Sequence, residues 1–200
     1  MREKFDPAEF HRQEREIKDE MMERYSHHQE VIDDQRTEIV EFPNFRIFAQ
    51  QGVGESARLL KILSGEKEFS LLSDLPEDHK LFLTFYPSAE YKHKKKELHI
   101  PHIYSRGALL SALHEFQHVS RRMNLSKQEL EKLNEARTAS SEEKSIEQKE
   151  LILLDERLAW DGAKIKAAEI EDILAIKIFQ DQDALESYIQ RKFATYEKFL

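Results

Sequence analysis

The sequence predicts an α+β fold, with a small mixed sheet in the first half and mostly helices in the second. Apolar residues alternate in short extended runs up to about Tyr104, and they follow helical spacing after Gly107. Glycine and proline number only five each, so the breaks between elements are short. A chain of 200 residues is long enough for one domain with a sizeable core. We therefore expect a charged helical arm over 1–36, followed by one α+β domain over 37–200.

The arm is predicted to be a helix because its start carries several N-terminal signals. Asp6 can cap the first turn, Pro7 suits the first helical position, and Glu9 follows the cap by three residues. The apolar residues make only a narrow stripe on a highly charged helix. They are Phe10, Ile17, Met21, Met22, Tyr25, Val31 and Ile32. Such a stripe must pack on something, and the domain is the expected partner.

Between the arm and residue 64, the pattern predicts an extended segment and a short helix. The segment 37–51 is rich in β-forming residues, and Pro43 with Asn44 supplies a bend in it. The segment 54–63 is expected to be helical. Its inward residues would be Ala57, Leu60 and Leu63.

Two further strands are predicted before the helical half. Residues 80–86 form an apolar run that Pro87 ends, and residues 97–104 form the second strand. Pro101 lies inside this second strand. Because proline cannot donate a hydrogen bond to a neighbouring strand, we expect 97–104 to be an edge strand.

Four helices account for the remaining chain. Residues 108–123 form the first, and Ser126 begins a capping-box pattern that starts the second. A similar pattern at Ser140 is expected to open a long helix that reaches about Ile178. The last helix is expected to start at Asp183 and to end near the C-terminus.

The first of these helices carries a motif with a chemical meaning. His114 and His118 are four residues apart, so on a helix they project from one face and can bind one zinc ion. Glu115 lies about 100° around the helix, within reach of a metal-bound water, and is the expected general base. The metal would lower the pKa of the water, and the carboxylate would take its proton as the water attacks a carbonyl. The alternative is a surface helix with two idle histidines.

A catalytic zinc ion needs a third protein ligand, and the chain restricts the choice. There is no cysteine, and no histidine follows His118. One class of zinc peptidases, the metzincins, has a third histidine six residues farther on, but that position is Asn124. A ligand from the later helices must therefore be Asp or Glu.

Asp155 and Glu156 are the candidates because they follow four aliphatic residues in the most apolar stretch of the C-terminal half. A buried carboxylate needs a partner, and a metal ion is one. Glu156 is preferred because it shares a helix face with Ala159 and Ala163, whose small size would let the two helices approach. Asp155 remains possible. In the alternative interpretation, the buried acid pairs with Arg157 or Arg121.

This arrangement resembles the gluzincin group of zinc metallopeptidases, in which a His-Glu-x-x-His helix is followed by a helix with a ligand Glu. The run Glu156-Arg157-Leu158-Ala159-Trp160 looks like the Glu-x-x-Ala signature of the small bacterial and phage members, the minigluzincins. The resemblance implies a zincin-like metallopeptidase domain over 37–200, whose edge strand lines the cleft. It also implies that His114, His118 and Glu156 hold the zinc ion, and that Glu115 is the catalytic base.

The chain departs from the larger gluzincins at two points. These commonly have an Asp four residues after the ligand Glu, where this chain has Trp160 followed by Asp161. The partner that would orient the histidines is therefore not identified. The group also uses a downstream Tyr or His to stabilise the oxyanion, and Tyr188 is the candidate here.

Charge and composition limit the partners. The net charge of −8 repels phosphate backbones, so we expect no nucleic-acid partner. The one basic cluster, His93-Lys94-Lys95-Lys96, is expected to be a solvated turn. We expect no membrane partner and a cytoplasmic location, because no stretch is apolar enough to span a bilayer or to act as a signal peptide. The absence of cysteine fits a reducing compartment.

The sequence thus predicts a zinc-dependent hydrolase of the peptidase class, acting on a protein or peptide. The substrate would lie along the edge strand as an added strand. The alternative is a non-catalytic helical interaction or scaffold protein on a degenerate zincin fold. The intact Glu115 favours the enzyme, because a decayed enzyme often loses its base first.

Overall fold

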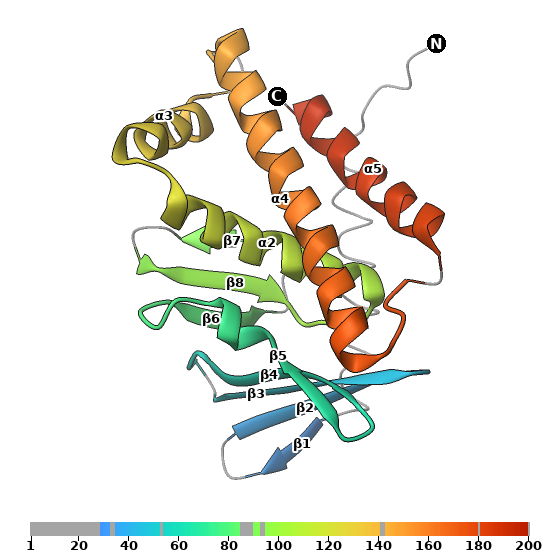
Figure 1. The fold of residues 1–200 in the computed structure, drawn as a ribbon. Helices are drawn as coiled ribbons and strands as arrows, with labels where there is room; N and C mark the ends of the chain where they lie inside the picture. Colours follow the sequence, from blue (N-terminus) through green and yellow to red (C-terminus); the bar gives the residue numbers. More distant parts are fainter. Residues whose placement is uncertain are drawn as a thin grey trace, which may run out of the picture.

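A computed structural model describes residues 29–32, 35–52, 54–84, 90–92, 95–140, 143–179 and 181–199 of the chain. Within this part, two small sheets come first and four α-helices follow (Figure 1). This order confirms the predicted α+β class with a mostly helical C-terminal half.

The first sheet is a five-stranded antiparallel meander. In order across the sheet its strands are β1 (Gln29–Ile32), β2 (Gln35–Phe42), β3 (Phe45–Gly52), β4 (Ala57–Ser64) and β5 (Lys67–Ser70). Phe42 pairs with Phe45 across the turn at Pro43 and Asn44, where the bend was predicted. Phe45 and Ile47 are buried at alternate positions of β3, so they point to the same face of the sheet.

Two predictions about this first sheet are wrong. The segment 54–63 was expected to be helical, but it contributes to β4, which pairs with β3 on one side and β5 on the other. Leu60 and Ile62, two positions apart, are fully buried, so the strand period decides the fold of this short apolar run.

The prediction of a helical arm over 1–36 is also wrong at the C-terminal end of this segment. Gln29–Ile32 and the start of β2 pair as antiparallel strands, so the backbone there is extended rather than helical. The predicted helix start at Asp6, Pro7 and Glu9 lies outside the described residues.

The second sheet is small and mixed, as predicted. Its order is β6 (Lys80–Thr84), β8 (Glu97–Pro101) and β7 (Glu90–Lys92), with β6 parallel and β7 antiparallel to β8. The prediction that 97–104 is an edge strand is wrong, because β8 lies in the middle. Pro101 is the last residue of β8 and lies beyond the residues that pair with β7. Its missing N–H therefore costs no hydrogen bond between β8 and β7.

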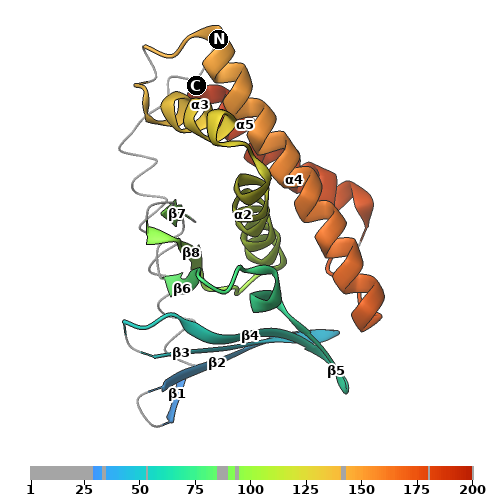
Figure 2. The same cartoon turned by 60° about the vertical axis from the view of Figure 1, so that its left-hand side comes forward.

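Helix α2 (Arg106–Asn124) lies between the second sheet and the long helix α4 (Ile146–Leu174), as Figures 1 and 2 both show. Small residues make the contact between the two helices close. Ala159 and Ala163 of α4 are fully buried. A Cβ atom on Gly162 would lie 2.6 Å from Oε1 of Gln117 on α2. The close approach expected from these small residues is therefore present.

The helix starts were predicted with mixed success. Helix α3 (Lys127–Thr138) begins with the capping box at Ser126, as expected. The start of α4 was placed at Ser140, but the box is formed by Ser145, and the hydroxyl of Ser140 donates to Glu143 in the preceding turn.

The ends of the last two helices also differ from the prediction. Helix α4 stops at Leu174, because Ala175 adopts a left-handed conformation with φ of 55°. Helix α5 (Gln182–Phe199) is capped by Asp181, whose carboxylate accepts from the N–H of Ala184 at 2.7 Å, two residues before the expected start at Asp183.

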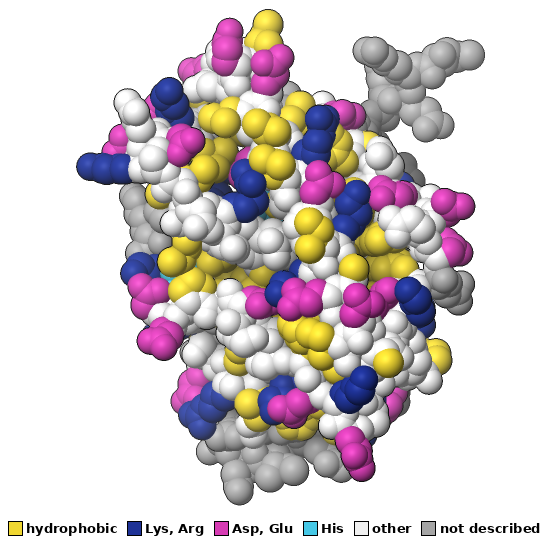
Figure 3. All heavy atoms as spheres, viewed as in Figure 1, with side chains coloured by type: hydrophobic (Ala, Val, Ile, Leu, Met, Phe, Trp, Pro, Cys, Tyr) yellow, Lys and Arg dark blue, Asp and Glu magenta, His cyan; other side chains and the backbone are white. Residues whose placement is uncertain are grey.

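The outer face of α4 remains partly apolar. Leu154, Leu158 and Ile165 of this helix are exposed. Figure 3 shows hydrophobic side chains at the surface of the helical half. Across the described residues, no helix combines the length and the apolar character that a membrane crossing requires.

Candidate metal centre

Helix α2 presents two histidines toward α4. Ser105 caps the helix by accepting from the N–H of Ala108 at 3.0 Å, which fixes where its turns begin. His114 and His118 are therefore one turn apart on the face that contacts α4, and Glu156 of α4 faces them. All three are buried, with exposed fractions of 1%, 5% and 1%.

The ligand atoms of these three residues converge on one point. Nε2 of His114 lies 3.0 Å from Nε2 of His118, and Oε2 of Glu156 lies 3.2 and 3.4 Å from these two nitrogens. In a tetrahedral zinc site with bonds of about 2.05 Å, neighbouring ligand atoms are about 3.4 Å apart. The triangle has the size that a metal ion needs, and the group could hold one.

Glu156 divides its two oxygens between the histidines and an arginine. Its Oε2 faces the imidazoles, and its Oε1 accepts from Nη2 of Arg137 on α3 at 2.7 Å. Burial alone would raise the pKa of Glu156. The bonds from His114 and His118 and the positive charges around it instead hold that pKa far below its usual range. Glu156 is therefore an anion whose Oε2 faces the two imidazoles.

Asp155 contacts the other side of His118. Its Oδ2 lies 3.2 Å from Nδ1 of His118, although the contact is not aligned as a linear hydrogen bond. The same carboxylate accepts from Arg137 at 2.8 Å and from Arg121 at 3.3 Å. The interpretation in which an acid pairs with Arg121 holds for Asp155, whereas Arg157 lies over the ring of Phe193 instead.

The pKa values of the two imidazoles shift in opposite directions. Burial would lower the pKa of His118, but the carboxylates of Asp155 and Glu156 outweigh it and raise that pKa to about 9. Burial lowers the pKa of His114, and Glu156 only partly compensates. One neutral and one charged ring can share a proton across the 3.0 Å between the two Nε2 atoms. A divalent cation at the same point would compete with that proton.

Glu115 lies beside the triad with an uncommitted carboxylate. Its Oε1 is 4.0 Å from Nε2 of His114, and its side chain is 15% exposed. No lysine or arginine in the described ranges pairs with it. A carboxylate in this position can exchange protons with a molecule bound at the triad.

Aromatic rings complete the wall of the centre. The ring of Trp160 stacks on His114 with the ring centres 4.0 Å apart, which fixes the plane of the imidazole. The ring centre of Tyr196 on α5 lies 6.5 Å from that of His114. Burial and the charges of Glu156 and Glu115 raise the pKa of Tyr196 well above its usual value, so its phenol keeps its proton.

Tyr188, the tyrosine proposed from the sequence, has a different role. Its hydroxyl donates to the carbonyl of Gly107 at 2.9 Å and lies 2.8 Å from the hydroxyl of Ser111. These bonds tie α5 to the first turns of α2. Tyr196 is therefore the better candidate for a phenol at the site.

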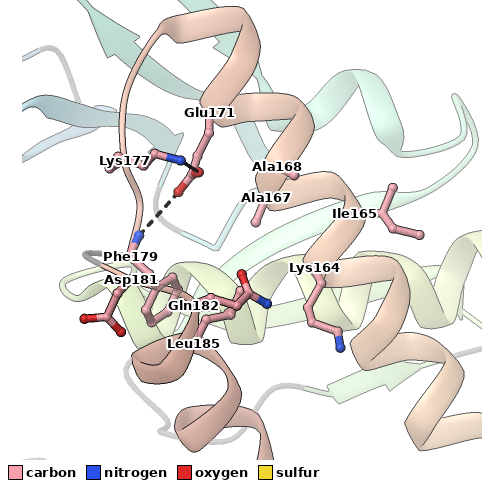
Figure 4. A pocket seen from close by; sticks show the side chains of 10 residues that line it. All are labelled: Lys164, Ile165, Ala167, Ala168, Glu171, Lys177, Phe179, Asp181, Gln182 and Leu185. Carbon is pink, nitrogen blue, oxygen red and sulfur yellow. Dashed lines mark hydrogen bonds and ion pairs between the residues drawn. The ribbon is translucent and has the colours of Figure 1, made fainter.

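One hollow on the surface lies away from this centre. A cavity of about 480 Å³ lies between the C-terminal half of α4 and the start of α5, and Figure 4 shows the side chains that line it. Its Glu171 is already occupied by Nζ of Lys177 and by the N–H groups of Ile178 and Phe179. Because Glu171 and Asp181, the two acids that line the cavity, both accept hydrogen bonds from within the chain, the cavity offers no free carboxylate of the kind found at the triad.

The sequence identified the triad but missed Arg137. Arg137 follows Leu133 by four residues, and Leu133 is buried, so the arginine shares the inward face of α3. That spacing was a usable signal.

Comparison of the chain with protein-family models, with curated proteins and with solved structures finds no match. The functional assignment therefore depends on the geometry of the centre.

Proposed function

We propose that His114, His118 and Glu156 bind a zinc ion and that the protein is a zinc-dependent hydrolase acting on peptide bonds. The proposal depends on one observation. The three ligand atoms lie 3.0 to 3.4 Å from one another. Two imidazoles and one carboxylate form a common catalytic zinc set, and three protein ligands leave a fourth position for water. The order of these residues along the chain, which resembles that of gluzincins, supports the same assignment.

Each residue around the centre has a role in such a reaction. A zinc ion bound there would bring the pKa of its water near neutrality. Glu115 would take the proton of this water and pass it to the leaving amine. Asp155 would keep the imidazole of His118 oriented. Tyr196 would donate a hydrogen bond to the carbonyl oxygen as it becomes negative.

The second sheet offers a place for the substrate. In the described ranges, β7 is an edge strand, since β8 pairs with only one of its sides. Helix α2 contacts β7, so an extended peptide added to its outer edge would lie near the histidine helix. This is consistent with a protein or peptide substrate.

Metal content tests the first part of the proposal. We expect about one zinc ion per chain after mild purification and zinc supplementation, measured by mass spectrometry of the metal. His118→Ala and Glu156→Ala should lose it, whereas Glu169→Ala, at an exposed site on α4, should retain it. Wild-type protein without zinc, or triad variants that keep full zinc content, would contradict the proposal.

Hydrolysis tests the second part. Glu115→Gln should keep the zinc ion and abolish cleavage of a peptide library, because the amide cannot accept the proton of water. Glu150→Gln, a similar change at an exposed position of α4, should cleave at the wild-type rate. Cleavage by Glu115→Gln at that rate would exclude Glu115 as the base.

A scaffold protein is the second candidate, and one observation favours it. Arg137 binds both Asp155 and Glu156, so these acids have a cationic partner within the chain. A buried ion network of this kind can be purely structural. Absence of zinc together with intact folding would select this alternative.

A further inference from the structure

We infer that Arg122 binds a carboxylate of the substrate, so that the protein selects acidic peptides. The inference rests on the proposed peptidase function and adds a substrate class to it.

Arg122 is placed to meet a substrate at the centre. It follows His118 by four residues and Glu115 by seven on α2. Seven residues are nearly two helical turns, so Arg122 and Glu115 project from the same face, about 10 Å apart along the axis. The guanidinium lies over the ring of Tyr91 on β7, with 5.1 Å between its Cζ atom and the ring centre. Arg122 thus lies between the histidine helix and the strand to which a peptide could add.

No carboxylate in the described ranges forms an ion pair with Arg122, although Asp155 and Glu115 lie close enough to act on its charge. Arg122 also forms no hydrogen bond there, and its Nε is buried without a partner. Neighbouring arginines differ, because Arg121 and Arg137 both bind Asp155. Arg122 is half-buried. Burying part of a guanidinium without a bonded counter-ion is unfavourable, so the site is suited to an anion that arrives with a ligand.

The chemistry of the group favours a carboxylate. A guanidinium presents parallel N–H groups that match the two oxygens of a carboxylate. The contact with the ring of Tyr91 restricts where this group can lie. The nearby acids are already engaged. Asp155 is bound by two arginines, and Glu115 is assigned to proton transfer.

The distance along α2 between Glu115 and Arg122 indicates where the carboxylate of the substrate would lie. An extended peptide advances about 3.3 Å per residue, so 10 Å corresponds to about three residues from the bond that is cleaved. Two sources could supply the group at that distance, an acidic side chain within a peptide or the free C-terminus of a short one.

The experiment uses zinc-loaded full-length protein and three matched sets of peptides. One set is neutral with a blocked C-terminus, one has a Glu moved through three positions on either side of the bond, and one is neutral with a free C-terminus. For wild type we expect kcat/KM at least about tenfold higher with a carboxylate than without it, mainly through KM. Preference for the Glu set or for the free C-terminus identifies the source.

Variants separate recognition from folding. Arg122→Gln should lose the preference and keep the zinc content, and Arg122→Lys should restore part of the preference. Arg58→Gln, at an exposed position on β4, should behave as wild type. Equal rates for acidic and neutral peptides in wild type would overturn the inference, as would a preference that survives in Arg122→Gln. A melting temperature clearly below wild type in Arg122→Gln would show a structural role and would also overturn it.

Failure of the proposed function can be told apart from failure of this inference. If the protein binds no zinc or cleaves nothing, the peptidase proposal fails, and the same peptides are then titrated by calorimetry. Tighter binding of the carboxylate peptides that Arg122→Gln abolishes would still support recognition by Arg122. Equal binding of all three sets would reject it.

Discussion

Asp155 and Glu156 are neighbours in the sequence but contact different sides of the same histidine. Successive residues of a helix point about 100° apart, so Glu156 reaches Nε2 of His118 while Asp155 reaches its Nδ1. The apolar run before these acids predicted their burial, and the shared face with Ala159 favoured Glu156. The contact with Arg137 was not predicted, because the packing of α3 on α4 depends on the whole fold.

Asp155→Asn should weaken zinc binding by about 10- to 100-fold, because a carboxylate behind a ligand histidine orients the ring and strengthens it as a ligand. The affinity can be measured by competition with a coloured chelator. Asp161→Asn, at a position that is 53% exposed on the same helix, is the matched control. Equal affinities in the two variants would show that Asp155 does not support the metal.

Arg137→Met should destabilise the chelator-treated protein, since it leaves two buried carboxylates with fewer cations around them. Removing one partner from a buried ion pair costs about 3–5 kcal/mol, and partial exposure of Arg137 places the expected loss near the lower end. Urea unfolding of Arg137→Met beside Arg58→Met measures it. A loss no larger than that of the Arg58 variant would contradict the prediction.

Helices α2 and α4 form the centre only because their contact is close. The sequence predicted this from Ala159 and Ala163, which share a helix face with Glu156, and both are fully buried. Strand predictions were less successful. In 54–63 the apolar residues fit a spacing of three as well as a spacing of two, and only pairing with β3 and β5 decides between them. Pro101 indicates that one position of β8 cannot donate a hydrogen bond to a neighbouring strand. It does not indicate that this position lies beyond the residues that pair with β7.

Ala163→Leu should push α4 away from α2. Three extra carbons in a packed interface cost about 1–3 kcal/mol, and the separation should also reduce zinc affinity because Glu156 moves with α4. Thermal unfolding and zinc titration measure the two effects. Ile165→Leu, on the exposed face of the same helix, should change neither. Unchanged zinc affinity in Ala163→Leu would mean that the centre tolerates a shift of α4.

Across the whole molecule, the helical half and the first sheet share one apolar core, and a few polar contacts also join them. Nζ of Lys166 on α4 lies 3.2 Å from Oδ1 of Asp74, and Nδ2 of Asn44 donates to the carbonyl of Lys177 at 3.0 Å. The candidate ligands come only from α2 and α4, so a bound metal would stabilise the helical half directly.

Chelation of the metal should therefore raise amide hydrogen exchange in one part of the protein more than in the other. We expect faster exchange in α2, α3 and α4, and little change in β3 and β4, because local opening follows the contacts that are lost. Exchange measured by mass spectrometry before and after chelator treatment tests this. A uniform increase across both sheets would show that the metal stabilises the molecule as one cooperative unit.

The stacking of Trp160 on His114 provides an optical reporter of the centre. Trp160 is the only tryptophan of the chain, so all indole emission comes from a ring 4.0 Å from a candidate ligand. Imidazolium quenches indole fluorescence more strongly than neutral imidazole does. A cation bound to His114 would also change the electronic contact between its ring and that of Trp160. Fluorescence intensity should therefore follow occupancy of the triad in real time, without any label.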